Sequence, residues 1–574
     1  MVSHLGLHRA HPYSEPSADQ HPPNRLRKQA CLACRRRKKR CDGNRPACST
    51  CSAWDFECVY ASASQASLDY GFPTPNSTLG SNATAQNLPV TLFGLPPELF
   101  PLPSETENPI NHGVPAYGGP SLDSDSPTYP SNQLPSTEQI VQLTEEFFVR
   151  LHPQFPCIHK ETFLDRLRGS PGPAPSTPLE WAVIATAARA HRDTTVSSRA
   201  DMLLQTAVNS LAQSPLLREN VLLDLQAAVW CVFSLYYSGE ITRAVVLLAQ
   251  AYSLACLNGL HQLDDPNPNV PGTMQFTPLE GEECRATLWA LFVLDRHINY
   301  LMGRHFVIDD MHWCVNYPLD DRSLQHGPRP EPEPYDRHLA ALASDKPNIP
   351  IGVSLRRLVC KASVIMGRIV TYKSINPIPT DADGTQRRLA DFHELQSALA
   401  CFWVSLPACV HNVAEVPPEN VDQSVWLLIT LHSCSTLLFY ITDVERRSPG
   451  APGGASLPTA RENFLCSYKS VDKVVAALRQ LSGLAIDAVL NPMLAPSYFM
   501  CCRFILARCR RESQPQSYRL DLNLVLKLLE RMAERQAQLP RIYKEIIDLE
   551  LERDVQGGVD GGRLLLRTDY CFLI

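Results

Sequence analysis

The 574-residue sequence lacks several features that would place it in other protein classes. The first 25 residues contain no apolar core of the kind that a signal peptide has, and no run of 18 apolar residues occurs. We therefore expect a protein that is neither secreted nor membrane-spanning. Without secretion, its 20 cysteines lie in a reducing compartment, where disulfide bonds are disfavoured.

Motifs of common catalytic sites are also missing. The sequence has no glycine-rich phosphate loop, no nucleophile elbow and no His-Glu-x-x-His motif. His152, His159 and His261 lie far apart in the sequence and have no paired carboxylates, so we expect them to be structural. With no candidate catalytic residue, we predict that the chain is not an enzyme.

Positive charge is absent from residues 61–135, which contain six acidic side chains and no Lys or Arg. Residues 25–45, in contrast, hold ten basic side chains and one acidic side chain. The overall net charge of -6 hides this segregation. A basic block within a mildly acidic chain indicates one dedicated module for a polyanion such as nucleic acid.

The most prominent feature of the sequence is a cluster of cysteines near its N-terminus. Six cysteines form two copies of Cys-x2-Cys-x6-Cys, offset by 17 residues: Cys31, Cys34, Cys41, Cys48, Cys51 and Cys58. Two tetrahedral zinc ions have eight ligand positions, so six thiolates fill them only if two thiolates bridge. The repeat predicts Cys31 and Cys48 as the bridging ligands of two Zn2+ ions. One ion would then be held by Cys31, Cys34, Cys41 and Cys48, and the other by Cys31, Cys48, Cys51 and Cys58.

Three other interpretations of the cysteines are less favoured. A disulfide scaffold requires an oxidising compartment. A single zinc ion leaves two thiols without a role. An iron–sulfur cluster leaves the neighbouring cations unexplained.

The two copies of the repeat differ in charge. Every residue between the second and third cysteines of the first copy is basic: Arg35, Arg36, Arg37, Lys38, Lys39 and Arg40. The second copy has residues 52–57, Ser-Ala-Trp-Asp-Phe-Glu, at that place. Because a phosphate backbone attracts the first set and repels the second, we expect the first copy to contact DNA. The basic run also suits a nuclear localisation signal.

The spacings, the basic block and the Arg-Pro-Ala-Cys turn at residues 45–48 resemble the fungal Zn2Cys6 binuclear cluster transcription factors. The resemblance implies that a basic residue four positions after the second cysteine, here Lys38, reads CGG-type triplets of double-stranded DNA. Upstream cations such as Arg27 would contact phosphates. Many members continue into a coiled coil, but residues 59–90 show no leucine heptad. Homodimerisation through another part of the chain and binding as a monomer both remain open.

Composition divides the chain into five parts. We predict a disordered N-terminus, a zinc-cluster DNA-binding domain, a disordered Ser/Pro-rich acidic linker, a helical regulatory domain and a C-terminal tail, at residues 1–24, 25–60, 61–135, 136–550 and 551–574 respectively. From residue 136 onward, apolar residues recur at helical spacing without strand alternation, as in the apolar stretches at 221–260 and 282–302. The predicted fold class is therefore all-α.

Local signals refine this helical domain. Ser136 and Gln139 form a candidate capping box, and Pro153 is expected to end the first helix. Leu522 begins another stretch of helical periodicity. Pro/Gly-rich stretches predict loops, at about 265–280, 318–351 and 447–458.

Three segments of this domain, at 147–164, 259–261 and 285–310, resemble the middle homology region of fungal zinc-cluster regulators. The resemblance covers about residues 136–320. It implies a helical regulatory domain that does not itself catalyse a reaction. Asp295 and Arg296, adjacent in an apolar helix, predict a buried ion pair that fixes helix packing.

Together the two resemblances imply a nuclear transcription factor of RNA polymerase II genes that recruits the transcription machinery or coactivators. Activators are commoner in the family than repressors, and control of a secondary-metabolite biosynthetic gene cluster is the favoured role. A metabolite-sensing regulator of a catabolic pathway is an alternative. An enzyme with an accessory DNA-binding tether is an alternative from another class, and it would retain turnover after its zinc ligands were mutated.

Overall fold

The computed structural model describes residue 34, residues 41–53 without 43 and 45, and residues 135–555 with internal gaps. The gaps are at 170–174, 215–219, 267–275, 302–304, 320–330, 343–354, 375–381, 413–414, 448–458, 484–485, 513–514 and 536. The chain separates into two compact units, residues 1–88 and 89–574, and each is treated by itself. The predicted N-terminal segment 1–24 and the linker up to residue 134 lie outside the described residues.

Within the described ranges every regular element is a helix, which confirms the all-α prediction. The first unit contains α2 (Ser49–Ala53). The α-helices of the second unit are α3 (Thr137–Arg150), α4 (Lys160–Gly169), α5 (Pro178–Ala190), α6 (Thr194–Ser197), α7 (Ala200–Gln213), α8 (Val221–Tyr237), α9 (Ile241–Leu257), α10 (Pro278–Asn299), α12 (Leu355–Ser374), α13 (Ala382–Ser405), α14 (Ala408–His411), α15 (Val421–Arg447), α16 (Thr459–Ser482), α17 (Ile486–Val489), α18 (Ala495–Glu512), α19 (Pro515–Glu534) and α20 (Gln538–Val555). Its short 3-10 helices are η2 (His152–Gln154), η4 (Leu260–Gln262), η5 (Leu339–Leu342), η7 (Pro418–Asn420) and η8 (Pro492–Leu494).

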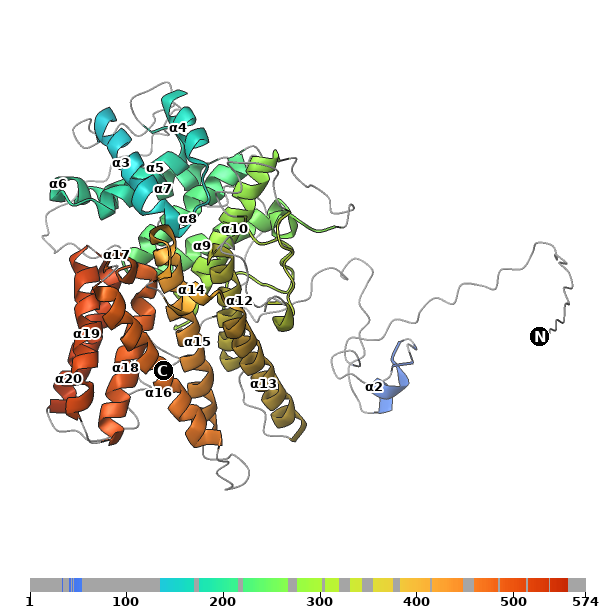
Figure 1. Cartoon of the computed structure of the whole chain (residues 1–574). Coiled ribbons are helices and arrows are strands. Elements are labelled where there is room, and N and C mark those ends of the chain that lie inside the picture. The colour runs from blue at the N-terminus through green and yellow to red at the C-terminus, as the bar shows by residue number, and fades with distance from the viewer. Residues whose placement is uncertain are drawn as a thin grey trace, which may run out of the picture. The chain divides into compact units, whose positions relative to one another are not determined.

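The second unit is built from two groups of helices. Figure 1 shows α3 to α10 in its upper part, while the long helices from α12 to α20 run beside one another below them. Helix α5 packs on α7 and α8, and α15 packs between α12 and α16. Helix α10 connects the groups because it contacts both α8 and α12. None of the described helices combines the length and the apolar character needed to cross a bilayer.

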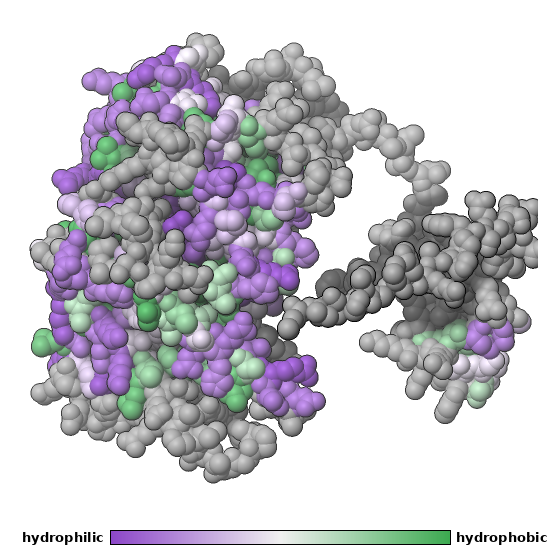
Figure 2. Space-filling view, turned by 45° about the vertical axis from the view of Figure 1, so that its right-hand side comes forward, coloured by the Kyte–Doolittle hydropathy of each residue, from purple (hydrophilic) through white to green (hydrophobic). Residues whose placement is uncertain are grey.

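A single apolar core runs through both groups of helices. Trp230 of α8 and Trp289 of α10 are among its largest fully buried side chains. The solvent-facing surface in Figure 2 is mainly hydrophilic, with apolar residues scattered among the polar ones. Most of the described cysteines outside the cluster are buried as small apolar side chains, whereas Cys401 of α13 is exposed.

The expected start of the first long helix is confirmed. Ser136 Oγ accepts a hydrogen bond from the Gln139 backbone N–H at 3.2 Å, and Gln139 Oε1 accepts one from the Ser136 N–H at 3.1 Å. This is a complete capping box at the beginning of α3. The helix ends at Arg150, and Pro153 lies in the short η2 that follows.

The structure places three element boundaries that the helical periodicity of the sequence does not show. The apolar stretch 221–260 is divided into α8 and α9 by Gly239, which has φ +79°. Its N–H and that of Glu240 bond to the carbonyls of Tyr236 and Leu235, which makes a Schellman cap. The loop expected up to residue 280 ends earlier, because Thr277 caps α10 and Pro278 is compatible with its first turn. Helix α20 also continues past residue 550, to Val555.

A buried carboxyl group in α8 predicts a pH-dependent stability. Burial raises the pKa of Asp224 to about 6, although Ser214 Oγ donates a hydrogen bond to it at 2.8 Å. The folded chain therefore binds this proton more tightly than the unfolded chain, and stability falls as pH rises from about 4 to 6. Asp224→Asn, which cannot ionise, should raise the free energy of unfolding at pH 7 by about 2 kcal/mol and have little effect near pH 4.

Urea denaturation of the full chain at both pH values measures this effect. Asp165→Asn is the matched control because this carboxylate is exposed. An equal change in stability at pH 4 and pH 7 for Asp224→Asn would contradict the assigned cause.

Candidate metal centre and nucleic-acid interface

The described part of the cysteine module is organised around the short helix α2. Asp42 lies ahead of this helix, and its carboxylate oxygens accept the Ser49 backbone N–H at 3.2 and 3.3 Å. The Ser49 hydroxyl and the Asn44 side-chain amide also donate to this carboxylate. These bonds, chiefly that from the Ser49 hydroxyl, lower the pKa of Asp42. Asp42 therefore connects the end of the first cysteine copy to the start of the second through hydrogen bonds.

Three sulfur atoms converge beside α2. Cys34 Sγ lies 3.6 Å from Cys48 Sγ and 3.9 Å from Cys51 Sγ, and all three side chains are buried. Ligand sulfurs about 2.3 Å from a tetrahedral zinc ion are separated from one another by about 3.8 Å. The observed spacings fit ligands arranged around a metal ion.

Cys48 takes part in two groups of candidate ligands. It lies with Cys34 and Cys51 in one, and with Cys41 and Asp42 in the other, each group having its ligand atoms within 4.8 Å of one another. Membership of both groups is what a bridging thiolate requires. The repeat assigns Cys34 and Cys51 to different ions, whereas their sulfurs here are as close as two ligands of one ion. The division of the ligands between the ions therefore stays a prediction.

Electrostatics explains why this cluster needs a cation. Burial raises the pKa of the Cys48 thiol, so a thiolate at this place requires a compensating positive charge. The Cys51 backbone N–H donates to Cys48 Sγ at 3.4 Å, but this N–H carries only a partial positive charge. A zinc ion would supply the rest, because it deprotonates the thiols that bind it.

Some predicted site residues lie outside the described residues: Cys31, Cys58, Arg35, Arg36, Arg37, Lys38, Lys39 and Arg40. The structure does bring together four of the six predicted ligands, Cys34, Cys41, Cys48 and Cys51. It also adds Asp42, which the cysteine spacing did not identify as part of the site. Its position directly after Cys41, as the one acidic residue in a basic block, was the available signal.

Comparison with known proteins agrees with this geometry. Residues 29–67 match the fungal Zn(2)-Cys(6) binuclear cluster domain, and residues 144–333 match the fungal specific transcription factor domain. The chain contains both domains of the fungal Zn(2)-Cys(6) transcription factors. The cluster domain implies that the chain binds zinc and DNA.

Several curated proteins that the chain resembles are named as transcription regulators. The citrinin biosynthesis transcriptional activator ctnR of Monascus purpureus is 24% identical over 57% of this chain and 62% of its own length. The Zn(2)-C6 fungal-type transcription factor FTF1c of Fusarium oxysporum f. sp. lycopersici is 24% identical over 71% of this chain and 50% of its own. The nitrogen assimilation transcription factor nirA of Emericella nidulans is 49% identical over 8% of this chain and 5% of its own. The chain thus spans less than two thirds of the length of each.

The matched helical domain contains the predicted buried ion pair. Arg296 donates to Asp295 at 2.5 Å, and their side chains are 3% and 0% exposed. Asp295 also accepts the backbone N–H groups of Val307 and Ile308 at 3.1 and 3.0 Å. The guanidinium lies over the Phe292 ring, 4.0 Å from its centroid. The pair therefore anchors the segment after α10, as expected of a structural ion pair.

Three of the histidines of this domain, His152, His159 and His261, are expected from the sequence to be structural. His152 Nε2 accepts the Ile158 N–H at 3.1 Å, and burial lowers the pKa of this ring to about 3. The His159 ring lies against the Thr162 hydroxyl, and the His261 carbonyl accepts the Cys314 N–H. No group of candidate metal ligands within the described ranges includes any of the three.

Proposed function

We propose that the chain is a nuclear, sequence-specific transcription regulator that docks on CGG-type DNA triplets through a binuclear zinc cluster. The observation that carries this proposal is the shared position of Cys48 between two groups of converging ligands, within a matched zinc-cluster domain. Six thiolates that share bridging sulfurs can hold two zinc ions. The six cations at residues 35–40 then supply the charge for a phosphate backbone.

The helical domain would regulate transcription by recruiting partner proteins rather than by catalysis. Its match to the fungal specific transcription factor domain supports this role. The relative ctnR is named as a citrinin biosynthesis activator, and a relative from Didymella fabae as an ascochitine biosynthesis cluster regulator. We therefore propose activation of a secondary-metabolite gene cluster. Genome-wide mapping of the occupied sites tests this role, and sites confined to catabolic genes would oppose it.

Lys38 is the residue proposed to read the triplet. Lys38→Ala should reduce the preference for CGG sites over scrambled sites by about tenfold or more, because a good contact to guanine O6 and N7 contributes about 1–3 kcal/mol of discrimination. Competition binding with the full zinc-loaded chain at fixed salt concentration measures this ratio.

Arg27→Ala is the matched control, since Arg27 is assigned to a phosphate. It should weaken binding to CGG and scrambled sites equally. It should also reduce the slope of the logarithm of the binding constant against the logarithm of the salt concentration by about one. If the Lys38 variant keeps the wild-type preference, the triplet is read by another residue. If neither DNA is bound by the wild-type chain, the proposed function fails.

A further inference from the structure

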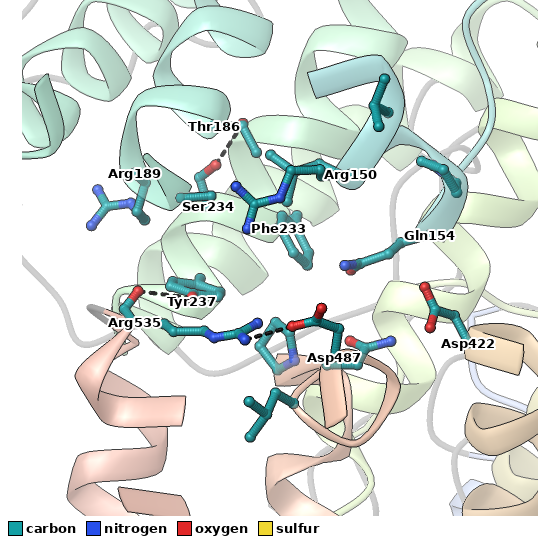
Figure 3. A pocket seen from close by; sticks show the side chains of 17 residues that line it. Arg150, Gln154, Thr186, Arg189, Phe233, Ser234, Tyr237, Asp422, Asp487 and Arg535 are labelled. Carbon is teal, nitrogen blue, oxygen red and sulfur yellow. Dashed lines mark hydrogen bonds and ion pairs between the residues drawn. The ribbon is translucent and has the colours of Figure 1, made fainter. Parts of the chain in front are cut away.

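A cavity of about 280 Å³ lies within the helical domain. One part of its wall comes from α3, η2, α5 and α8, and the other comes from α15, α17, η8 and the turn after α19 (Figure 3). Segments from opposite ends of the domain thus meet around it. Its volume is near the lower end of small-molecule pockets, which are about 300–1,000 Å³.

Several charges at the cavity already have partners. Arg535 pairs with Asp487 at 2.6 Å, and its backbone carbonyl accepts the Tyr237 hydroxyl at 3.0 Å (Figure 3). Arg189 donates to Asp201, outside the cavity lining, at 2.5 Å. These interactions stabilise the wall, and a ligand gains little from groups that are already paired.

Two lining charges have no such partner. Among the described lining residues, Arg150 and Asp422 form neither an ion pair nor a hydrogen bond, and both side chains are exposed. The pKa of Asp422 is raised, first by the protein atoms around its carboxyl group and then by the negative charge of the nearby Asp487. A cation at Asp422 and an anion at Arg150 would each meet a charge that no described protein group neutralises.

An amide and an apolar wall complete the site. Figure 3 shows Gln154 reaching toward the middle of the cavity, with Arg150 and Asp422 on either side of it. Gln154 Oε1 is buried and has no hydrogen-bond partner, so it is an acceptor in need of a donor. Phe233 and Leu490 give the same cavity an apolar surface.

We propose that this cavity binds a small zwitterion of the α-amino-acid class. The ligand carboxylate pairs with Arg150, its ammonium group is held by Asp422 and Gln154 Oε1, and its side chain packs on Phe233. A ligand with an anion alone leaves Asp422 unpartnered, and a ligand with a cation alone leaves Arg150 unpartnered. The zwitterion pairs with all three groups, and it connects α3 and η2 with the start of α15.

Calorimetry with the full zinc-loaded chain and each of the twenty L-amino acids, without DNA, tests the proposal. At least one should bind with a dissociation constant of about 1 mM or lower and raise the unfolding temperature. Its N-acetyl derivative and its decarboxylated amine, which lack one charge each, should bind about tenfold more weakly or worse. Absence of binding by all twenty overturns the proposal, as does unchanged affinity for either derivative.

Variants then locate the binding site. Arg150→Gln and Asp422→Asn should each weaken binding about tenfold or more, because each removes a charge-assisted contact. Arg192→Gln and Asp391→Asn are the matched controls, since both side chains are exposed and lie outside the cavity lining. Equal affinities for cavity and control variants would place the ligand elsewhere and overturn the assignment. Because no DNA is present, neither outcome depends on the proposed regulatory function.

Discussion

Cys48→Ala is expected to release both zinc ions and to reduce DNA affinity to its non-specific level. Cys48 is fully buried and belongs to both groups of candidate ligands, so in the proposed binuclear cluster its loss would remove one ligand from each ion. Structural zinc contributes about 10–16 kcal/mol in small domains, which have little apolar core of their own. The expected loss of specific binding is about a thousandfold. Elemental analysis of the purified full chain, together with competition binding, measures both effects.

Two further variants isolate the bridging role. Cys51→Ala removes a ligand that the repeat assigns to a single ion, and this chain should retain more metal than Cys48→Ala. Cys401→Ala makes the same chemical change at an exposed cysteine of α13 and should leave zinc content and DNA binding unchanged. Two ions retained per Cys48→Ala chain would show that Cys48 does not bridge.

The helical fold could be predicted from the sequence because local signals dominate it. The capping box of α3 and the helical periodicity of α19 depend on residues a few positions apart, and both are present in the structure. The division of the stretch 221–260 depends on Gly239, whose positive φ is a property of one residue inside an otherwise helical pattern. Periodicity alone cannot show where such a residue ends a helix.

The candidate sites differ in how much the sequence reveals of them. Candidate zinc ligands could be proposed from the sequence because metal geometry restricts cysteine spacing strongly. Asp42 was not identified, because its role depends on the Ser49 N–H seven residues later and on how the chain turns between them. The cavity beside Arg150 could not be foreseen at all. It forms only when α3 meets α17, which lies more than 300 residues later in the chain.

Removal of the buried carboxylate at Asp295 should produce the largest loss of stability in the helical domain. Asp295→Ala leaves the Arg296 guanidinium buried without its counter-ion and frees the N–H groups of Val307 and Ile308. Breaking a buried pair on one side costs about 3–5 kcal/mol. Urea denaturation of the full chain, followed by helical circular dichroism, should show this loss. Asp165→Ala, at an exposed ion pair with Arg168, should change stability by less than about 1 kcal/mol.

Gly367 of α12 offers a second test of this ion pair, because it lies against the Arg296 side chain. A Cβ atom added at this glycine would lie 2.6 Å from Arg296 Nε and 3.0 Å from its Cδ. The guanidinium has little room to retreat, because it lies between the rings of Phe292 and Phe306. Gly367→Ala should therefore destabilise the domain by about 1–3 kcal/mol. Both changes act on Arg296, so the double variant should lose less stability than the two single losses added together, and strict additivity would show that Gly367 and Asp295 act independently.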